Sequence, residues 1–203
     1  MRIAPVSALL VSTFAGTLAV QAAAPVPRPT KEFTIILPSG QQKLLSSYRA
    51  GKVVMMAFMF TTCPHCQALS KIITKLQGEL GPRGFQALGV AFNDEVNTAN
   101  NATNAQVTAN FVNQFQVGFP VGYAPRDSVL SYLGISDIER WAVPQVVIID
   151  RKGVIRAQSA AGGTTELQTE DYLRKYLGEL LDEGKSATPA KAPAKKAADK
   201  KTS

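Results

Sequence analysis

Eight consecutive apolar residues, Val53 to Phe60, constrain the fold of this chain more than any other feature. The run is far shorter than the roughly 20 residues that a membrane-spanning helix needs, and it lacks the alternation of a strand with one wet face. It indicates a strand that is buried on both faces, in the middle of a sheet covered by helices. Leucines and isoleucines at helical spacing follow it, and Gly81-Pro82 ends that helix.

The remaining segments predict an α/β domain with a central mixed β-sheet flanked by helices and an N-terminal β-hairpin. The expected elements are the hairpin 33–37 and 42–45, the buried strands 53–60, 85–92 and 145–150, a returning strand 154–160, and helices ending near 80 and over 106–115, 127–133 and 169–183. Residues 118–122 are expected to form a turn or a short edge segment, and Asp127 and Thr169 are candidate helix caps. Strand–helix–strand units require parallel neighbours, and the last two strands can add an antiparallel edge.

The first 24 residues are expected to be an export signal or a retained N-terminal anchor. Arg2 gives a positive start, residues 3–20 are almost wholly apolar or small, and the alanines that follow suit signal peptidase. Residues 3–20 are also at the lower limit of length for spanning a bilayer, so membrane anchoring through them stays open. In either case we expect the folded domain to be periplasmic or otherwise extracytoplasmic.

Most of the formal net charge of +7 comes from the C-terminal end of the chain. Residues 185–203 carry six lysines against one acid, and their Ala, Lys and Pro composition predicts a disordered tail. The expected organisation is a signal or anchor over 1–24, a linker over 25–32, one folded domain over 33–184, and this tail. The folded part is nearly neutral, so no nucleic-acid partner is expected.

The two cysteines of the chain are three positions apart, in the motif Cys63-Pro64-His65-Cys66. A disulfide between them would close so short a loop that it would stabilise the fold very little. A structural zinc site would need two further ligands, and the sequence has no other cysteine or histidine to supply them. We therefore expect no metal and no cofactor, and we interpret the pair as a redox site.

The junction between strand and helix indicates that Cys63 is the attacking nucleophile. A helix N-terminus carries free N–H groups and a partial positive charge, and both favour a thiolate over a thiol. Pro64 fits the first helical turn, and a protonated His65 would favour the thiolate further. Cys66 lies one turn into the helix, where it can resolve a mixed disulfide on Cys63. The expected partners are protein thiols or disulfides and a redox partner protein.

These residues resemble the thioredoxin superfamily. The resemblance rests on Val53 to Cys66, on Val143-Pro144 and on the strand–turn–strand ending, and it covers roughly residues 33–183. It implies a thioredoxin-like fold and an exported thiol–disulfide oxidoreductase. The hairpin and the segment 93–142 are most similar to the TlpA/ResA-type branch, usually reductants, whereas the Pro-His dipeptide resembles DsbA-type oxidases. Both directions of electron flow therefore stay open.

The resemblance also implies residues that bind substrate. In the superfamily a proline with a cis peptide bond lies against the cysteine pair, and here that proline is Pro144. The main chain of Val143 would then pair with an extended peptide. Trp141 is expected either to cover the site or to pack in the core.

The chain departs from the superfamily pattern at two places. Many members have a buried acid six residues before the first cysteine, which helps to move the proton of the second thiol, and here that residue is Ala57. The usual aromatic residue before the first cysteine is replaced by Thr61-Thr62. The sequence therefore names no general base.

Two other functions on the same fold stay open. A copper-binding or copper-delivery protein could hold Cu(I) with two thiolates, but such proteins normally add a distant histidine, which this chain lacks. A peroxiredoxin-like peroxidase would need a threonine three residues before its nucleophile, and Phe60 stands there.

Overall fold

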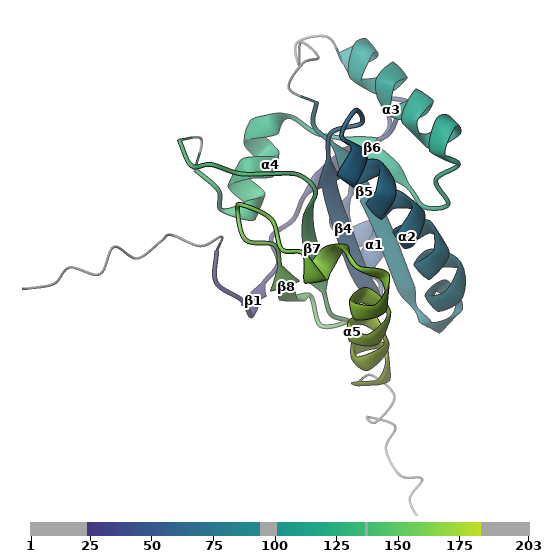
Figure 1. Cartoon of the computed structure of the whole chain (residues 1–203), viewed down its shortest axis with the longest axis vertical. Coiled ribbons are helices and arrows are strands. Elements are labelled where there is room, and N and C mark those ends of the chain that lie inside the picture. The colour runs from purple at the N-terminus through teal and green to yellow at the C-terminus, as the bar shows by residue number, and fades with distance from the viewer. Residues whose placement is uncertain (1–23, 94–100, 137, 184–203) are drawn as a thin grey trace, which may run out of the picture.

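The apolar run at 53–60 forms the central strand of a β-sheet, as predicted (Figure 1). In the computed structural model, which describes residues 24–93, 101–136 and 138–183, every residue of β4 (Val53–Met59) is buried. β4 pairs in parallel with β5 (Phe85–Ala91) on one side and antiparallel with β7 (Gln145–Ile149) on the other. The sheet is therefore mixed, and its centre is covered on both faces.

Five further strands complete the sheet. They are β1 (Arg28–Pro29), β2 (Thr34–Ile36), β3 (Gln42–Leu44), β6 (Val121–Tyr123) and β8 (Val154–Gln158). The strand order is β1-β8-β7-β4-β5-β6-β2-β3. Both predicted hairpins are confirmed, because β2 pairs antiparallel with β3 and β7 pairs antiparallel with β8.

Two short segments differ from expectation because they join the sheet. The stretch at 118–122, predicted as a turn or an edge segment, supplies β6, which is an interior strand because the N-terminal hairpin extends the sheet beyond it. The stretch predicted as a linker, 25–32, holds β1, which pairs with β8. The Thr30 N–H extends this attachment by donating to the carbonyl of Gly153 at 2.9 Å.

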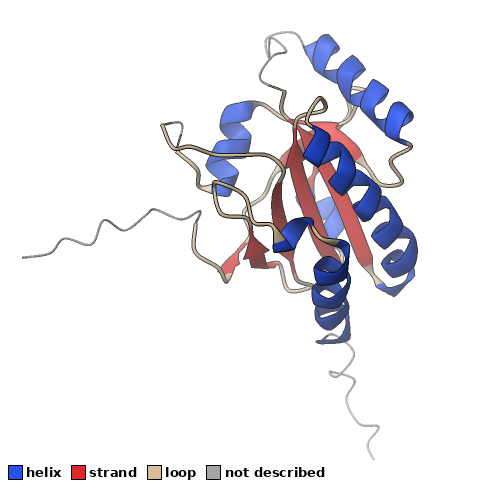
Figure 2. Ribbon diagram, in the orientation of Figure 1, coloured by secondary structure: helices blue, strands red, loops and turns tan. Residues whose placement is uncertain are grey.

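Helices lie on both faces of the sheet (Figure 2). They are α1 (Leu45–Arg49), α2 (Pro64–Leu80), α3 (Asn101–Phe115), α4 (Arg126–Leu133) and α5 (Glu170–Glu183), with short 3-10 turns at Gly81–Arg83 and Glu166–Gln168. The odd-numbered residues of β4 pack with α2 and α5, and the even-numbered residues pack with α4. This period of two divides the core into two layers around the sheet.

The helices also differ from expectation: α1 was not predicted, and the starts of α3 and α4 lie elsewhere than expected. α3 begins at Asn101 rather than 106, because its packing against β6 overrides the weak helix propensity of its asparagines. The prediction of Asp127 as a cap is wrong, because Pro125 precedes α4 and Asp127 lies inside its first turn. Thr169 lies directly before α5, but its hydroxyl donates to the Glu166 carbonyl at 3.1 Å.

Ion pairs fix α5 against the rest of the domain. Arg174 of α5 pairs with Glu79 of α2 at 3.0 Å, and Glu170 pairs with Lys75 of α2 at 2.7 Å. At the far end of α5, Glu183 pairs with Arg156 of β8 at 2.8 Å. α5 is therefore joined by ion pairs to α2, to β8 and, through Asp182 and Arg83, to the 3-10 turn at Gly81–Arg83.

The predicted tail and nearly all of the predicted signal or anchor lie outside the described residues. Within the part of the chain that is described, no helix combines the length and the apolar character that crossing a membrane requires.

Candidate redox site

Cys63 occupies the junction between the central strand and α2. It is the N-cap residue of α2, with extended backbone angles, and Pro64 is the first helical residue. The Cys63 N–H donates to the Phe60 carbonyl at 3.2 Å, and the Cys63 carbonyl accepts from the Gln67 N–H at 3.0 Å. These bonds hold the half-buried Cys63 at the electropositive end of the helix, as its place in the sequence predicts.

The peptide bond between Val143 and Pro144 is cis, which confirms that prediction. Pro144 is buried and directly precedes β7, so Val143 lies beside the end of β4. The Cys63 thiol approaches the Val143 carbonyl oxygen at 3.9 Å. Residues that are 80 positions apart are thus brought to one site.

Cys66 differs from Cys63 in its surroundings. Both thiols are free in this structure, but Cys66 is only 1% exposed and belongs to the core layer between β4 and α2. Burial raises the pKa of the Cys66 thiol, and the neighbouring Cys63 sulfur raises it further. Cys66 is therefore a protonated, protected thiol behind a reachable one.

His65 is exposed in the first turn of α2, between the two cysteines. This position is compatible with the expected effect of its charge on Cys63, and that role stays a prediction.

A hydrogen-bonded clamp that the sequence did not reveal holds the residues before Cys63. The Asn93 side-chain carbonyl accepts from both the N–H and the hydroxyl of Thr61, at 2.7 and 3.0 Å. The Gln67 side-chain amide donates to the Thr61 carbonyl at 3.0 Å. Asn93 follows β5, which is parallel to β4, so the ends of both strands meet at one edge. That adjacency is the signal that could have identified Asn93.

A second clamp holds the segment before Pro144. The Gln145 side-chain amide lies within hydrogen-bond distance of the carbonyls of Ala142, Ala160 and Ala161, at 2.7, 3.1 and 2.9 Å. The Ala142 N–H also donates to the Ala161 carbonyl at 2.8 Å. These bonds attach the Val143 segment to the loop after β8.

Trp141 packs against aromatic rings on the α4 side of the sheet. Its ring centroid is 5.7 Å from that of Phe60 and 5.6 Å from that of Phe92, and the Arg126 guanidinium lies 5.3 Å from its centre. The side chain is half-buried. Contact of Trp141 with substrate stays a prediction.

The core around the cysteines has no carboxylate in the described part of the chain. Ala57, where the superfamily pattern has an acid, is buried in the same layer as Cys66. The only buried acid among the described residues is Asp150, which lies at the opposite end of β7 and pairs with Arg156 at 3.2 Å. The described residues also contain no group of three or more His, Cys, Asp or Glu side chains placed to hold a metal ion.

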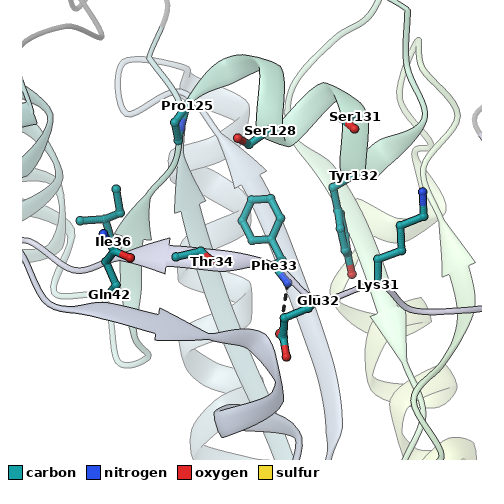
Figure 3. Close-up of a pocket in the computed structure, with 10 residues that line it drawn as sticks. All are labelled: Lys31, Glu32, Phe33, Thr34, Ile36, Gln42, Pro125, Ser128, Ser131 and Tyr132. Atoms are coloured by element: carbon teal, nitrogen blue, oxygen red, sulfur yellow. Dashed lines mark hydrogen bonds between the residues drawn. The ribbon is translucent and has the colours of Figure 1, made fainter.

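A separate pocket of about 400 Å³ lies on another part of the molecule, between β2 and α4 (Figure 3). Phe33 and Tyr132 contribute rings to it, and Ser128 and Ser131 contribute hydroxyls from α4. Neither cysteine lines it.

The fold and the cysteine site together define a protein of the thioredoxin-like class. The chain belongs to the AhpC/TSA family, whose model matches residues 26–158.

The similarity to an individual curated relative is lower and covers part of the chain. The thiol-disulfide oxidoreductase ResA of Halalkalibacterium halodurans is 27% identical over 124 residues, which is 61% of each chain. This chain therefore spans about 61% of the length of that curated relative.

Solved structures share the fold. One is a thioredoxin-family thiol:disulfide interchange protein from Chlorobium tepidum, with a TM-score of 0.60 and 20% identity over 78% of this chain and 99% of that one. Another is the thioredoxin domain of a thiol-disulfide oxidoreductase from Bacteroides vulgatus, with a TM-score of 0.59 and 18% identity over the same shares.

Proposed function

We propose that this protein is an extracytoplasmic thiol–disulfide oxidoreductase that exchanges disulfides with protein substrates through Cys63 and Cys66. The observation that supports it best is the unequal pair of thiols. Cys63 is reachable at a helix N-terminus beside Val143, and Cys66 is buried one turn behind it. The ResA relative, named a thiol-disulfide oxidoreductase, supports the same activity.

The geometry supports a two-step exchange. The Cys63 thiolate attacks one sulfur of a substrate disulfide, forming a mixed disulfide and releasing the other substrate sulfur as a thiolate. Cys66 then attacks the Cys63 sulfur, forming the Cys63–Cys66 disulfide, and the second substrate sulfur leaves. The two substrate sulfurs have gained two electrons, and the proton of Cys66 ends on a departing thiol. The reverse sequence oxidises a substrate dithiol.

Val143 is the proposed point of contact with the substrate main chain. A peptide that pairs with Val143 in an extended conformation would place its disulfide close to Cys63, because the Val143 carbonyl lies beside that sulfur. The buried Pro144 and the bonds of Gln145 hold this segment in place.

Disulfide reduction by single-cysteine variants tests the proposal. Cys63→Ala is expected to abolish insulin reduction, and Cys66→Ala is expected to accumulate mixed disulfides that gel electrophoresis detects without reductant. Ser128→Ala, in the pocket on α4, is the matched control and should retain full activity. Native activity in Cys63→Ala would show that the nucleophile is elsewhere, and peroxide consumption faster than disulfide exchange would favour a peroxidase.

A further inference from the structure

A hollow of about 220 Å³ opens directly beside the cysteine loop, between that loop and α3. Thr62, which precedes Cys63, and Gln67, which follows it by one turn, line one wall. Asn110 and Gln114 of α3 line the other. Sites for drug-sized ligands have volumes of about 300–1,000 Å³, so this hollow suits a single side chain.

The lining of the hollow is apolar at its base and polar at its rim, and none of the lining residues that the structure describes is charged. Phe111 is buried and Phe115 half-buried, whereas Asn110 and Gln114 are exposed. A charged side chain that entered the hollow would lose water without gaining an opposite charge. An uncharged side chain could contact the phenylalanine rings, while the carboxamides of Asn110 and Gln114 form hydrogen bonds with the main chain of the same peptide.

The absence of charge extends along the whole of α3. None of its 15 residues is Asp, Glu, Lys or Arg, in a chain where these types make up 18%. The loop that leads to Val143 differs, because it contains Glu139 and Arg140. The wall of the hollow that α3 supplies therefore carries no formal charge.

The sheet order places the hollow and Val143 on opposite sides of Cys63. Cys63 follows β4, Val143 precedes β7 on one side of β4, and α3 packs on β6, which lies beyond β5 on the other side (Figure 1). When an extended peptide pairs with Val143 and presents its sulfur to Cys63, the hollow lies on the side of that sulfur away from Val143. A residue that flanks its cysteine would then reach the hollow.

We propose that this hollow is a substrate subsite that selects peptides with an uncharged residue flanking the reacting cysteine. The inference rests on the proposed disulfide exchange and adds the class of substrate. The groups that contact the flanking residue are the ring of Phe111 and the carboxamides of Gln67, Asn110 and Gln114.

Rates of reduction of short peptides test the subsite. Each peptide carries one cysteine disulfide-bonded to a fluorescent reporter thiol, with Leu, Gln, Asp or Lys placed before or after the cysteine. The reduced full-length protein is expected to act on the Leu and Gln peptides about tenfold faster in kcat/KM than on the Asp and Lys peptides, at one of the two positions.

Variants separate the subsite from the redox pair. Gln114→Glu is expected to raise the Lys-to-Asp rate ratio at that position by up to about fivefold, the size of an exposed ion pair. Asn113→Glu adds the same charge to an exposed position of α3 that does not line the hollow, and should leave the ratio unchanged. Val107→Trp fills the hollow and should remove the preference for Leu.

The outcomes distinguish the two proposals. If no peptide reacts in a Cys63-dependent manner, disulfide exchange itself is refuted. If the peptides react but their rate ratios are the same in the wild type, Gln114→Glu and Asn113→Glu, the redox activity stands and the subsite is refuted. Gln114 is exposed, so the comparison of these glutamate variants does not depend on whether Val107→Trp folds.

Discussion

Cys66 must lose a proton before it can resolve a mixed disulfide, and its surroundings disfavour the thiolate. Burial raises its pKa, and the described core around it offers no carboxylate, since Ala57 stands at the position of the superfamily acid. The Cys66 thiolate is therefore scarce at neutral pH. Resolution, rather than the first attack, is expected to limit turnover.

We predict that the resolution rate rises with pH by up to tenfold per unit through about pH 9, because the thiolate fraction rises in that proportion below the pKa of the thiol. Stopped-flow release of a reporter thiol from the Cys63 mixed disulfide measures this rate. Ala57→Asp should raise the rate at pH 7 by supplying a proton acceptor, and Ala57→Asn is the neutral control. Equal rates in the two variants would show that proton transfer does not limit resolution.

Asn93 is the residue whose loss should disturb the cysteine loop most. Asn93→Ala removes two hydrogen bonds to Thr61 and leaves a buried N–H without a partner, which is expected to lower the free energy of unfolding by about 1–3 kcal/mol. Thr61→Val removes only the hydroxyl bond and should have a smaller effect. Urea denaturation of both variants measures the difference, and an equal loss in the two would contradict a role for the main-chain bond.

The residues that sequence could identify at the site are those with a local signal. Cys63, Pro64 and Cys66 form a motif between a strand and a helix, and Pro144 opens an apolar strand. Asn93 and Gln145 have no such signal, because the groups that they bind become neighbours only when strands align.

At the level of elements, the position of the segment before β7 is held by the side chain of Gln145, the first residue of that strand. The two N–H groups of the Gln145 side chain donate within a set of three nearby carbonyls, those of Ala142, Ala160 and Ala161, and so connect the approach to Val143 with the loop after β8. Gln145 is fully buried, so these bonds are shielded from water.

Gln145→Leu keeps a similar volume and removes these bonds. We expect kcat/KM for insulin reduction to fall about tenfold, because the Val143 segment would be held less firmly for substrate binding. This factor corresponds to the net free energy of roughly one hydrogen bond. Alkylation of Cys63 by iodoacetamide should keep its native rate, because the N-terminus of α2 is unchanged. A parallel fall in both rates would indicate a general loss of structure instead.

The longer elements could be predicted from the pattern of apolar residues along the sequence. The buried strands β4, β5 and β7 were predicted from continuous apolar runs, and the helices α2 and α5 from apolar residues at helical spacing. β1 was missed and β6 was predicted only as a turn or a short edge segment, because two or three residues show no periodicity and pairing with neighbouring strands alone defines them.

At the scale of the whole molecule, the stability of the fold should fall at acidic pH. Hydrogen bonds from Lys75 and Arg174 lower the pKa of Glu170, and those from Arg156 lower the pKa of Glu183. A carboxyl whose pKa is lowered by folding stabilises the fold above its unfolded pKa, and this contribution is lost as pH falls through the folded value.

We predict that the midpoint of thermal unfolding falls as pH is lowered from about 5 to 3, because the unfolded glutamate pKa is about 4.3 and the folded values lie below it. Both carboxylates are exposed enough for salt to screen them, so the effect should be modest. Glu170→Gln should flatten the dependence, and an unchanged slope in that variant would exclude the Lys75 pair as a source.

The unequal burial of the two sulfurs also makes the reduced protein a ready target for site-directed conjugation. Of the two thiols in the sequence, one is half-buried at the surface and the other is 1% exposed. A maleimide spin label or photo-crosslinker added in limiting amount would attach at Cys63 without engineered cysteines. The tag would then occupy the position of an arriving substrate, and its crosslinks would map what docks there.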